Sequence, residues 1–188
     1  MKHLVANRDR GYAGYLTVER LTIRLPDGRL ALREVESHGN AVAVLPYDPE
    51  RRTALIVSQF RAPVFATTGE ESIVEACAGM IEDGNAEATV RREAAEELGL
   101  RVGVLEFVAR VWPSPGVSTE QASLFLAPYR AADRVGPGGG VESEHEDITV
   151  LEVSLSVLAS DADGGRIVDM KLLTLVSAMR LRHPALFS

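Results

Sequence analysis

The segment 78–100, AGMIEDGNAEATVRREAAEELGL, carries most of the information about how this chain folds. Asn85 is a residue type that favours the N-cap of a helix, and Gly99 is the type that ends a helix in the left-handed conformation. Between them, three apolar residues recur every four positions: Val90, Ala94 and Leu98. Because this spacing places side chains on one helical face, the segment predicts a helix over about 85–98 with one side packed on a core.

Three carboxylates in this segment have the spacing i, i+3 and i+4: Glu93, Glu96 and Glu97. On a helix they share one face, where like charges repel, and they lie in the last turns, where the helix dipole disfavours anions. A divalent cation such as Mg²⁺, which prefers carboxylate oxygens, would compensate this charge. The alternative is a solvated acidic face on which Arg92 pairs with Glu96 four residues later.

Alternating and turn-forming residues predict further elements. Residues 15–36 form a predicted hairpin around the turn Pro26-Asp27-Gly28, where proline presets φ and glycine accepts a positive φ. A second long helix is expected at 170–181 and a short one at 155–160, while the glycine run 136–140 predicts a flexible loop. Short apolar runs predict strands at 41–45, 54–57, 72–78, 103–111, 122–127 and 148–153. Strands interspersed with a few helices predict an α+β sandwich.

The composition excludes several classes of protein. With 188 residues and 46% hydrophobic residues, the chain is long enough for one cored domain. Twenty basic against 27 acidic residues give a net charge of −7, which argues against a nucleic-acid partner. The single cysteine, Cys77, excludes an intramolecular disulfide and a cysteine-based zinc cluster. No apolar run has the length of a membrane helix or signal peptide, so we expect a cytoplasmic protein without a membrane partner.

The segment from Gly79 to Leu100 resembles the Nudix signature, in which a glycine and a loop are followed by Arg-Glu-x-x-Glu-Glu-x-Gly, here Arg92 to Gly99. The resemblance implies an α/β/α sandwich with a mixed sheet and metal-dependent cleavage of a diphosphate linked to another moiety. The chain departs from the signature at Asn85, where a glutamate is usual, and its spacing from Gly79 to Arg92 is one residue shorter. This shortening resembles the GDP-mannose pyrophosphatase branch.

The resemblance also implies site residues. Mg²⁺, with Mn²⁺ as an alternative, would be held by one backbone carbonyl and three carboxylates: Ala78, Glu93, Glu97 and Glu146. The catalytic set would be Glu146, from an acidic loop that would otherwise be solvated surface, with Glu93, Glu96 and Glu97. Substrate-binding residues would be Tyr15, Leu32, Arg33, Glu34, Arg61, Glu120 and Lys171. Of these, Arg61 and Lys171 would contact phosphate.

Three functional hypotheses follow from the resemblance. The leading one is hydrolysis of a nucleoside diphosphate sugar, with GDP-mannose yielding GMP and mannose 1-phosphate. The first alternative is ADP-ribose hydrolysis to AMP and ribose 5-phosphate, because the loop 112–116 also resembles that branch. The second is a nucleotide-binding module without turnover, against which the complete glutamate set argues. The resemblance further implies a homodimer in which an N-terminal hairpin element, 1–40, packs on the partner and completes the site of its Nudix domain, 41–188.

Overall fold

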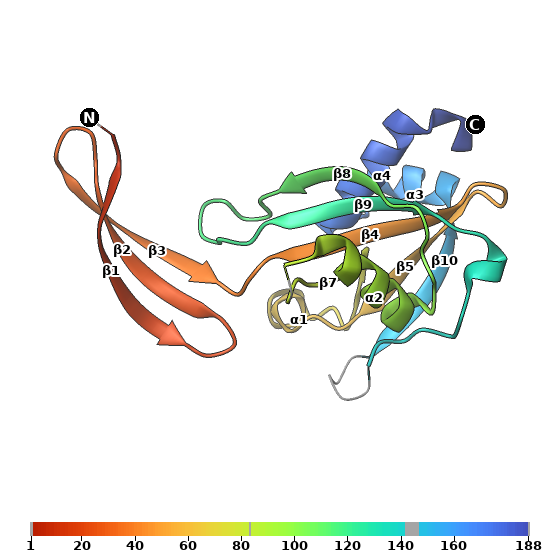
Figure 1. The fold of residues 1–188 in the computed structure, drawn as a ribbon, viewed down its shortest axis with the longest axis horizontal. Helices are drawn as coiled ribbons and strands as arrows, with labels where there is room; N and C mark the ends of the chain where they lie inside the picture. Colours follow the sequence, from red (N-terminus) through yellow and green to blue (C-terminus); the bar gives the residue numbers. More distant parts are fainter. Residues whose placement is uncertain (1, 83, 142–146, 188) are drawn as a thin grey trace. The chain divides into compact units, whose positions relative to one another are not determined.

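The computed structural model describes residues 2–82, 84–141 and 147–187 (Figure 1). The chain forms two compact units. The first comprises residues 1–40 together with 111–121, and the second comprises 41–110 together with 122–188. No described helix is long and apolar enough to cross a membrane.

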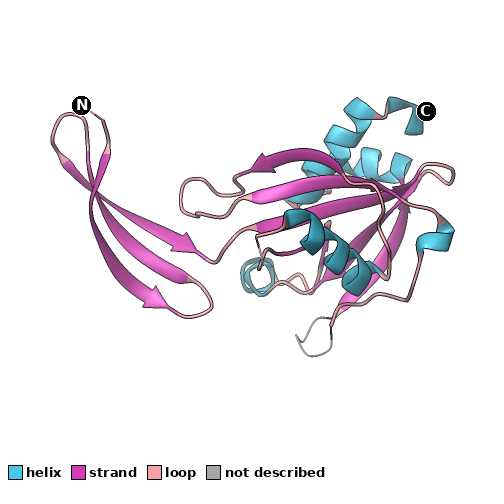
Figure 2. Cartoon of the chain, in the orientation of Figure 1, coloured by secondary structure: helices cyan, strands magenta, loops and turns pink. Residues whose placement is uncertain are grey.

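The first unit contains, within the described residues, a three-stranded antiparallel sheet of order β1-β2-β3, drawn in magenta in Figure 2. The predicted hairpin is confirmed as β2 (Thr17–Arg24) paired with β3 (Leu30–Ser37), and Gly28 in the turn has a φ of 88°. The first strand, β1 (Leu4–Ala13), was not predicted. Every residue of β1 is exposed, so its sequence carries no alternation of apolar and polar side chains.

The second unit contains a mixed sheet that has seven strands among the described residues, in the order β10-β5-β4-β9-β8, with β6 on β5 and β7 on β4. Strands β4 and β9 are parallel, whereas β10, β6 and β7 each run antiparallel to their partners. The strands are β4 (Ala41–Asp48), β5 (Thr53–Gln59), β6 (Ile73–Glu75), β7 (Cys77–Met80), β8 (Glu106–Val111), β9 (Ala122–Pro128) and β10 (Ile148–Ser154).

Helices cover this sheet on both sides and make an α/β/α sandwich, which confirms the predicted α+β fold. The described residues form the α-helices α1 (Ala62–Thr68), α2 (Ala86–Leu98), α3 (Leu155–Asp163) and α4 (Met170–Arg182). Short 3₁₀ turns occur at Ala131–Asp133 and Pro184–Leu186. Helix α2 packs on β4, β5, β7 and β10, and α4 packs on β4 and β9.

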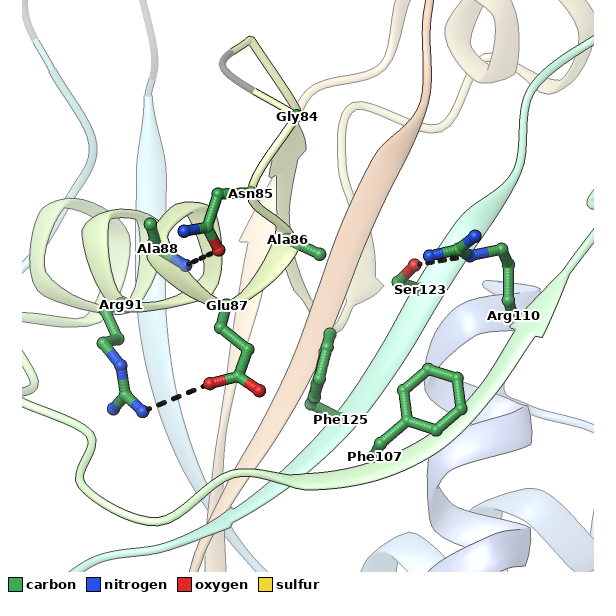
Figure 3. A pocket seen from close by; sticks show the side chains of 10 residues that line it. All are labelled: Gly84, Asn85, Ala86, Glu87, Ala88, Arg91, Phe107, Arg110, Ser123 and Phe125. Carbon is green, nitrogen blue, oxygen red and sulfur yellow. Dashed lines mark hydrogen bonds and ion pairs between the residues drawn. The ribbon is translucent and has the colours of Figure 1, made fainter.

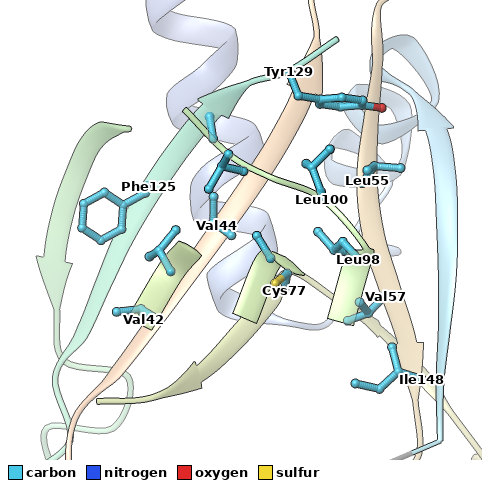
Figure 4. Packing of buried hydrophobic residues seen from close by; sticks show 14 residues of the cluster. Val42, Val44, Leu55, Val57, Cys77, Leu98, Leu100, Phe125, Tyr129 and Ile148 are labelled. Atoms are coloured by element: carbon cyan, nitrogen blue, oxygen red, sulfur yellow. The ribbon is translucent and has the colours of Figure 1, made fainter. Parts of the chain in front are cut away.

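Helix α2 has the boundaries that its sequence predicts. The side chain of Asn85 accepts a hydrogen bond from Ala88 N at 3.1 Å, and Gly99 ends the helix with a φ of 60°. The three residues of the apolar stripe, Val90, Ala94 and Leu98, are 0% exposed. They pack against the row of strand residues shown in Figure 4, which includes Val44, Leu55, Val57, Cys77 and Phe125.

The predicted strand 72–78 is wrong as a single element, because the chain breaks at Ala76 into β6 and β7. Strand β6 pairs with β5, whereas β7 pairs with β4. The backbone N–H of Ala76 donates to the Asp169 carboxylate at 3.2 Å instead of joining a strand ladder. The predicted strand 103–111 is also shorter, since β8 begins at Glu106.

Helix α1 was missed because its sequence has weak helical preference. Its residues, APVFATT, are rich in β-branched types, which lose rotamer freedom in a helix. Pro63 fits the first turn, and Gly69 ends the helix in the left-handed conformation with a φ of 79°. A proline at the start and a glycine at the end are the local signals that could have identified it.

The glycine run 136–140 is a loop, as predicted, but it packs closely against the end of α2. Gly139 N donates to Glu97 O at 2.9 Å, and Gly140 N donates to Glu96 O at 3.2 Å. Val135 N and Gly136 N both donate to Gly99 O. Because the last carbonyls of a helix lack partners within it, this run satisfies groups that α2 leaves open.

We predict that Gly99→Ala destabilises the protein more than Gly165→Ala. Both glycines have a positive φ, 60° and 67°, which costs an alanine about 1–2 kcal/mol. A Cβ at Gly99 would also overlap the Gly136 carbonyl, whereas a Cβ at Gly165 meets nothing within 4 Å. The overlap should add about 1–3 kcal/mol, the usual cost of overpacking. Urea unfolding of both variants measures the difference, and equal losses would show that the glycine run does not constrain the end of α2.

Candidate functional site

Two carboxylates of α2 are buried against strand β7. Glu93 is 7% exposed and Glu97 is 2% exposed. Ala78 N donates a hydrogen bond to Glu97 Oε2 at 3.2 Å. The Glu93 carboxylate fills the space beside Gly79, where a Cβ on residue 79 would overlap it. The helix therefore presents two carboxylates to the β7 backbone at Ala78 and Gly79, and the glycine is needed for this approach.

Arg92 links the third glutamate of the predicted face to the buried pair. Its Nη2 lies 2.7 Å from Glu93 Oε1, and its Nη1 lies 2.7 Å from Glu96 Oε2. The Arg92–Glu96 pair expected for a solvated acidic face is thus present, and Glu96 stays partly exposed. Burial lowers the pKa of Arg92, but the charges of Glu93 and Glu96 outweigh it and leave this pKa above its ordinary value. Of the three glutamates on this helix face, only Glu93 and Glu97 are buried.

The donors at this point fit a hard divalent cation. Glu93, Glu97 and the Ala78 carbonyl would offer oxygen alone, the ligand type that Mg²⁺ prefers. Within the described residues, no three side chains of His, Cys, Asp or Glu come together as a metal site. The fourth predicted ligand and catalytic residue, Glu146, lies outside the described residues. The described part of the chain therefore contains three of the four predicted ligands, two of them buried carboxylates.

A second charged cluster joins the two cations predicted to contact phosphate. Arg61 donates from Nε and Nη2 to the Glu75 carboxylate at 2.6 and 3.1 Å. Lys171 Nζ lies 3.5 Å from Glu75 Oε2 and 2.8 Å from Asp169 Oδ1. Glu75 is 3% exposed. The fold thus brings Arg61, the N-cap residue of α1, and Lys171, from the start of α4, onto one buried carboxylate.

Both cations of this cluster are held in the charged form. Burial lowers the pKa of Arg61, but hydrogen bonding and charge from Glu75, with the charges of Glu97 and Asp169, raise it above its ordinary value. Burial also lowers the pKa of Lys171, and the nearby Asp169 and Glu75 carboxylates raise it further than burial lowers it. The charge of Glu97 acts on Arg61, so the second cluster is electrostatically connected to the buried pair of α2.

Glu75 and Asp169 are the site residues that sequence reasoning missed. Asp169 caps α4 by accepting from Lys171 N at 3.2 Å and Leu172 N at 3.0 Å, and it also accepts from Ala76 N. Its position just before a predicted helix is an N-cap signal that could have identified it. Glu75 is a lone carboxylate inside the apolar run IVEACAG, and a charge in a buried strand requires a partner.

The other predicted substrate-binding residues lie in the first unit. Tyr15 is 86% exposed, and it lies in the turn between β1 and β2 instead of the predicted strand. Leu32, Arg33 and Glu34 are exposed on β3, where Arg33 Nη1 donates to Leu32 O at 2.7 Å. These four side chains are not held by contacts with a core.

Glu120, also in the first unit, belongs to a small polar group around His38. Its Oε2 lies 3.5 Å from His38 Nε2, and His38 Nδ1 lies 2.8 Å from Glu36 Oε2. A hydrogen bond from the Ser118 hydroxyl lowers the pKa of Glu36, burial opposes this, and His38 adds to the lowering. Glu120 is therefore partnered within its own unit.

A cavity of about 780 Å³ opens on the other flank of α2 (Figure 3). Phe107 and Phe125 meet edge to face there with ring centroids 5.6 Å apart, and Arg110 Nε donates to Ser123 Oγ at 3.3 Å. None of the predicted site residues that the structure describes lines this cavity. Its lining is Gly84, Asn85, Ala86, Glu87, Ala88, Arg91, Phe107, Arg110, Ser123 and Phe125.

Known proteins resemble this chain in sequence and in fold. A model of the NUDIX domain matches residues 37–168. GDP-mannose pyrophosphatase of Cronobacter sakazakii is 39% identical over 151 residues, which cover 80% of this chain and 78% of that protein. GDP-mannose pyrophosphatase of Escherichia coli O1:K1 is 33% identical over 174 residues, 90% of each chain. In fold, a crystal structure of an ADP compounds hydrolase superposes with a TM-score of 0.79 at 15% identity, covering 98% of this chain and 96% of that one.

We predict that Glu75→Gln lowers the free energy of unfolding by about 2–3 kcal/mol. Removing one partner of a buried ion pair costs about 3–5 kcal/mol, and the partial exposure of Arg61 reduces that figure. Urea unfolding at pH 7 measures the loss. Glu70→Gln is the control, because Glu70 is an exposed carboxylate and should change stability by no more than about 0.5 kcal/mol. Equal effects of the two substitutions would mean that Glu75 does not hold the cluster together.

Proposed function

Since this chain belongs to the Nudix family of hydrolases, we propose that it hydrolyses the diphosphate bond of GDP-mannose, with Mg²⁺ as cofactor, to GMP and mannose 1-phosphate. The observation that carries this proposal is the pair of buried carboxylates, Glu93 and Glu97, against the β7 backbone. Identity of 33–39% to GDP-mannose pyrophosphatases over most of the chain supports the choice of substrate.

In the proposed reaction, Glu93, Glu97 and the Ala78 carbonyl would hold the metal, together with Glu146 as the fourth ligand. Bound Mg²⁺ neutralises charge on a diphosphate and lowers the pKa of a coordinated water. Gly79 leaves room for the Glu93 carboxylate, and the Ala78 N–H orients Glu97. Glu146 also accepts the proton of the attacking water.

Arg61 and Lys171 bind the diphosphate oxygens in this proposal. Arg61 uses Nε and Nη2 on Glu75, which leaves its remaining donors for a phosphate oxygen. When no substrate is bound, the negative charges of Glu75 and Asp169 offset the positive charges of Arg61 and Lys171. The two cations can therefore lie close together despite their mutual repulsion. Arg92 pairs with both Glu93 and Glu96. Through this shared partner, Glu96 helps to hold Arg92 against Glu93, and this is its role in the proposed catalytic set.

The first unit, in the same proposal, packs on a second copy of the chain and supplies Tyr15 and residues 32–34 to the partner's substrate, while Glu120 lies in the substrate cleft. Among the described residues of its three strands, Leu21 is the one buried side chain. Large apolar side chains are exposed there, including Leu4, Tyr12, Leu30 and Leu32. A small sheet with so little core is marginal in water, and an exposed apolar surface marks an interaction site.

Two other functions remain as alternatives within the same test. ADP-ribose hydrolysis is the second candidate, because the loop 112–116 also resembles the ADP-ribose branch. A binding module without turnover is the third. The order of turnover rates over a nucleotide-sugar panel distinguishes the two enzymes, and binding without turnover identifies the module.

We predict that the protein releases mannose 1-phosphate from GDP-mannose faster than it cleaves ADP-ribose, and that EDTA abolishes both reactions. Glu97→Gln should lower kcat by roughly 10²-fold or more, because losing even an outer contact of a metal site costs about 10–100-fold. Its thermal stability should stay equal or rise, because one of two neighbouring buried charges is removed.

The control for this measurement is Glu87→Gln, on the same helix but exposed and 3.8 Å from Arg91. It should leave kcat unchanged. Near wild-type turnover of Glu97→Gln at saturating Mg²⁺ would contradict the assigned ligand, and faster cleavage of ADP-ribose would contradict the assigned substrate.

We predict a homodimer in solution, with a mass of twice the 20.3 kDa of one chain. Light scattering at micromolar concentration measures the mass, and Tyr12→Asp together with Leu30→Glu should shift it toward the monomer because charges are placed on the exposed apolar face. A wild-type monomer with full activity would contradict both the dimer and the shared site.

A further inference from the structure

Gln59, the last residue of β5, has an amide that the proposed mechanism does not use. Its side chain is 8% exposed, and its Nε2 is the one buried side-chain nitrogen or oxygen in the described residues without a hydrogen-bond partner. Buried donors almost always have a partner, because leaving one unsatisfied costs stability. A buried donor that nothing in the described protein satisfies is therefore a place to look for a ligand.

The strand register sets the direction of the Gln59 side chain. Gln59 is two residues beyond Val57 and four beyond Leu55, both of which lie in the cluster under α2. Side chains two and four positions apart share one face of a strand. Gln59 also lies opposite Ile148 of β10, another member of that cluster. The amide therefore extends this row on the α2 side of the sheet, where Glu93 and Glu97 lie.

The neighbours of Gln59 at this end of the sheet are the phosphate-binding candidates. Glu75 lies opposite Val57, so it shares the face of Gln59 at the diagonal position. Arg61, two residues after Gln59, pairs with Glu75 there, and Lys171 reaches the same carboxylate. Glu75 accepts hydrogen bonds from Arg61 and forms an ion pair with Lys171, whereas the Nε2 of Gln59 has no hydrogen-bond partner among the described residues.

We propose that Gln59 is a further substrate-binding residue, whose Nε2 donates a hydrogen bond to a non-bridging oxygen of the substrate diphosphate beside Arg61. This rests on the proposed function, which places the diphosphate at Arg61 and Lys171. A neutral donor suits this position because the two cations already balance Glu75 and Asp169. A phosphate oxygen supplies the acceptor that the buried amide lacks.

The test is a calorimetric titration with inorganic pyrophosphate in the presence of Mg²⁺, combined with urea unfolding of the free protein. Gln59→Met keeps an unbranched side chain of similar length but removes the amide. Gln59→Glu keeps the shape and replaces the donor with a carboxylate. Ser58→Ala is the matched control, because Ser58 points to the opposite face of the same strand.

Gln59→Met should bind pyrophosphate roughly tenfold more weakly, the usual effect of losing one hydrogen bond to a charged group. Its urea midpoint should not fall, because no protein partner of the amide is lost. Gln59→Glu should bind more weakly still, through repulsion of phosphate, and Ser58→Ala should bind like the wild type.

Unchanged pyrophosphate affinity in Gln59→Met would overturn the inference, and so would a lowered urea midpoint with unchanged affinity, which would show that the amide serves the fold. If Gln59→Met does not fold, the pyrophosphate affinity of Gln59→Glu is measured instead, and an unchanged affinity of that variant would overturn the inference. The titration needs no turnover, so a wild type that binds pyrophosphate but cleaves no nucleotide sugar contradicts the proposed function alone. Wild-type turnover with unchanged affinity in the variants contradicts the Gln59 assignment alone.

Discussion

Burial of the apolar stripe of α2 against the sheet is the constraint on which the candidate site depends. Val90, Ala94 and Leu98 are fully buried, so the rotation of the helix about its axis is determined by packing. Glu93 and Glu97 lie beside that stripe and are buried together with it. A carboxylate in such a place must be hydrogen-bonded or paired. The Ala78 N–H and the Arg92 guanidinium supply those contacts, and a divalent cation would complete them.

Five consecutive residues, 75–79, connect this buried pair to the cationic cluster. Glu75 holds Arg61 and Lys171, and Ala76 N donates to Asp169. Cys77 packs in the core, and the next two residues meet the glutamates of α2. The break between β6 and β7 is thus the point at which one short segment serves both clusters. A shift of this segment would disturb the metal ligands and the phosphate-binding cations together.

The departure from the Nudix signature at Asn85 has a structural explanation. The side chain of Asn85 caps α2 by accepting from Ala88 N, and its backbone carbonyl accepts from Thr89 N at 3.0 Å. At the other end, the glycine run 136–140 satisfies the last carbonyls of the helix, and Gly99 is confined by the Gly136 carbonyl. Both ends of α2 are therefore fixed by polar contacts while its centre is fixed by packing, which holds the carboxylates in place.

Local patterns in the sequence determined the elements whose signals lie within a few residues: the capped helix over 85–98, the hairpin over 15–36, the last long helix and the family. They also predicted that Glu93 and Glu97 share one helical face, because helical spacing brings those residues together. The tertiary structure alone decided that Glu75 and Asp169 are buried partners of Arg61 and Lys171. It also decided that 72–78 splits into two strands and that the glycine run closes the end of α2. The physical reason is distance along the chain: Ala76 and Asp169 are 93 residues apart, and a hydrogen bond between them leaves no local period or propensity in the sequence.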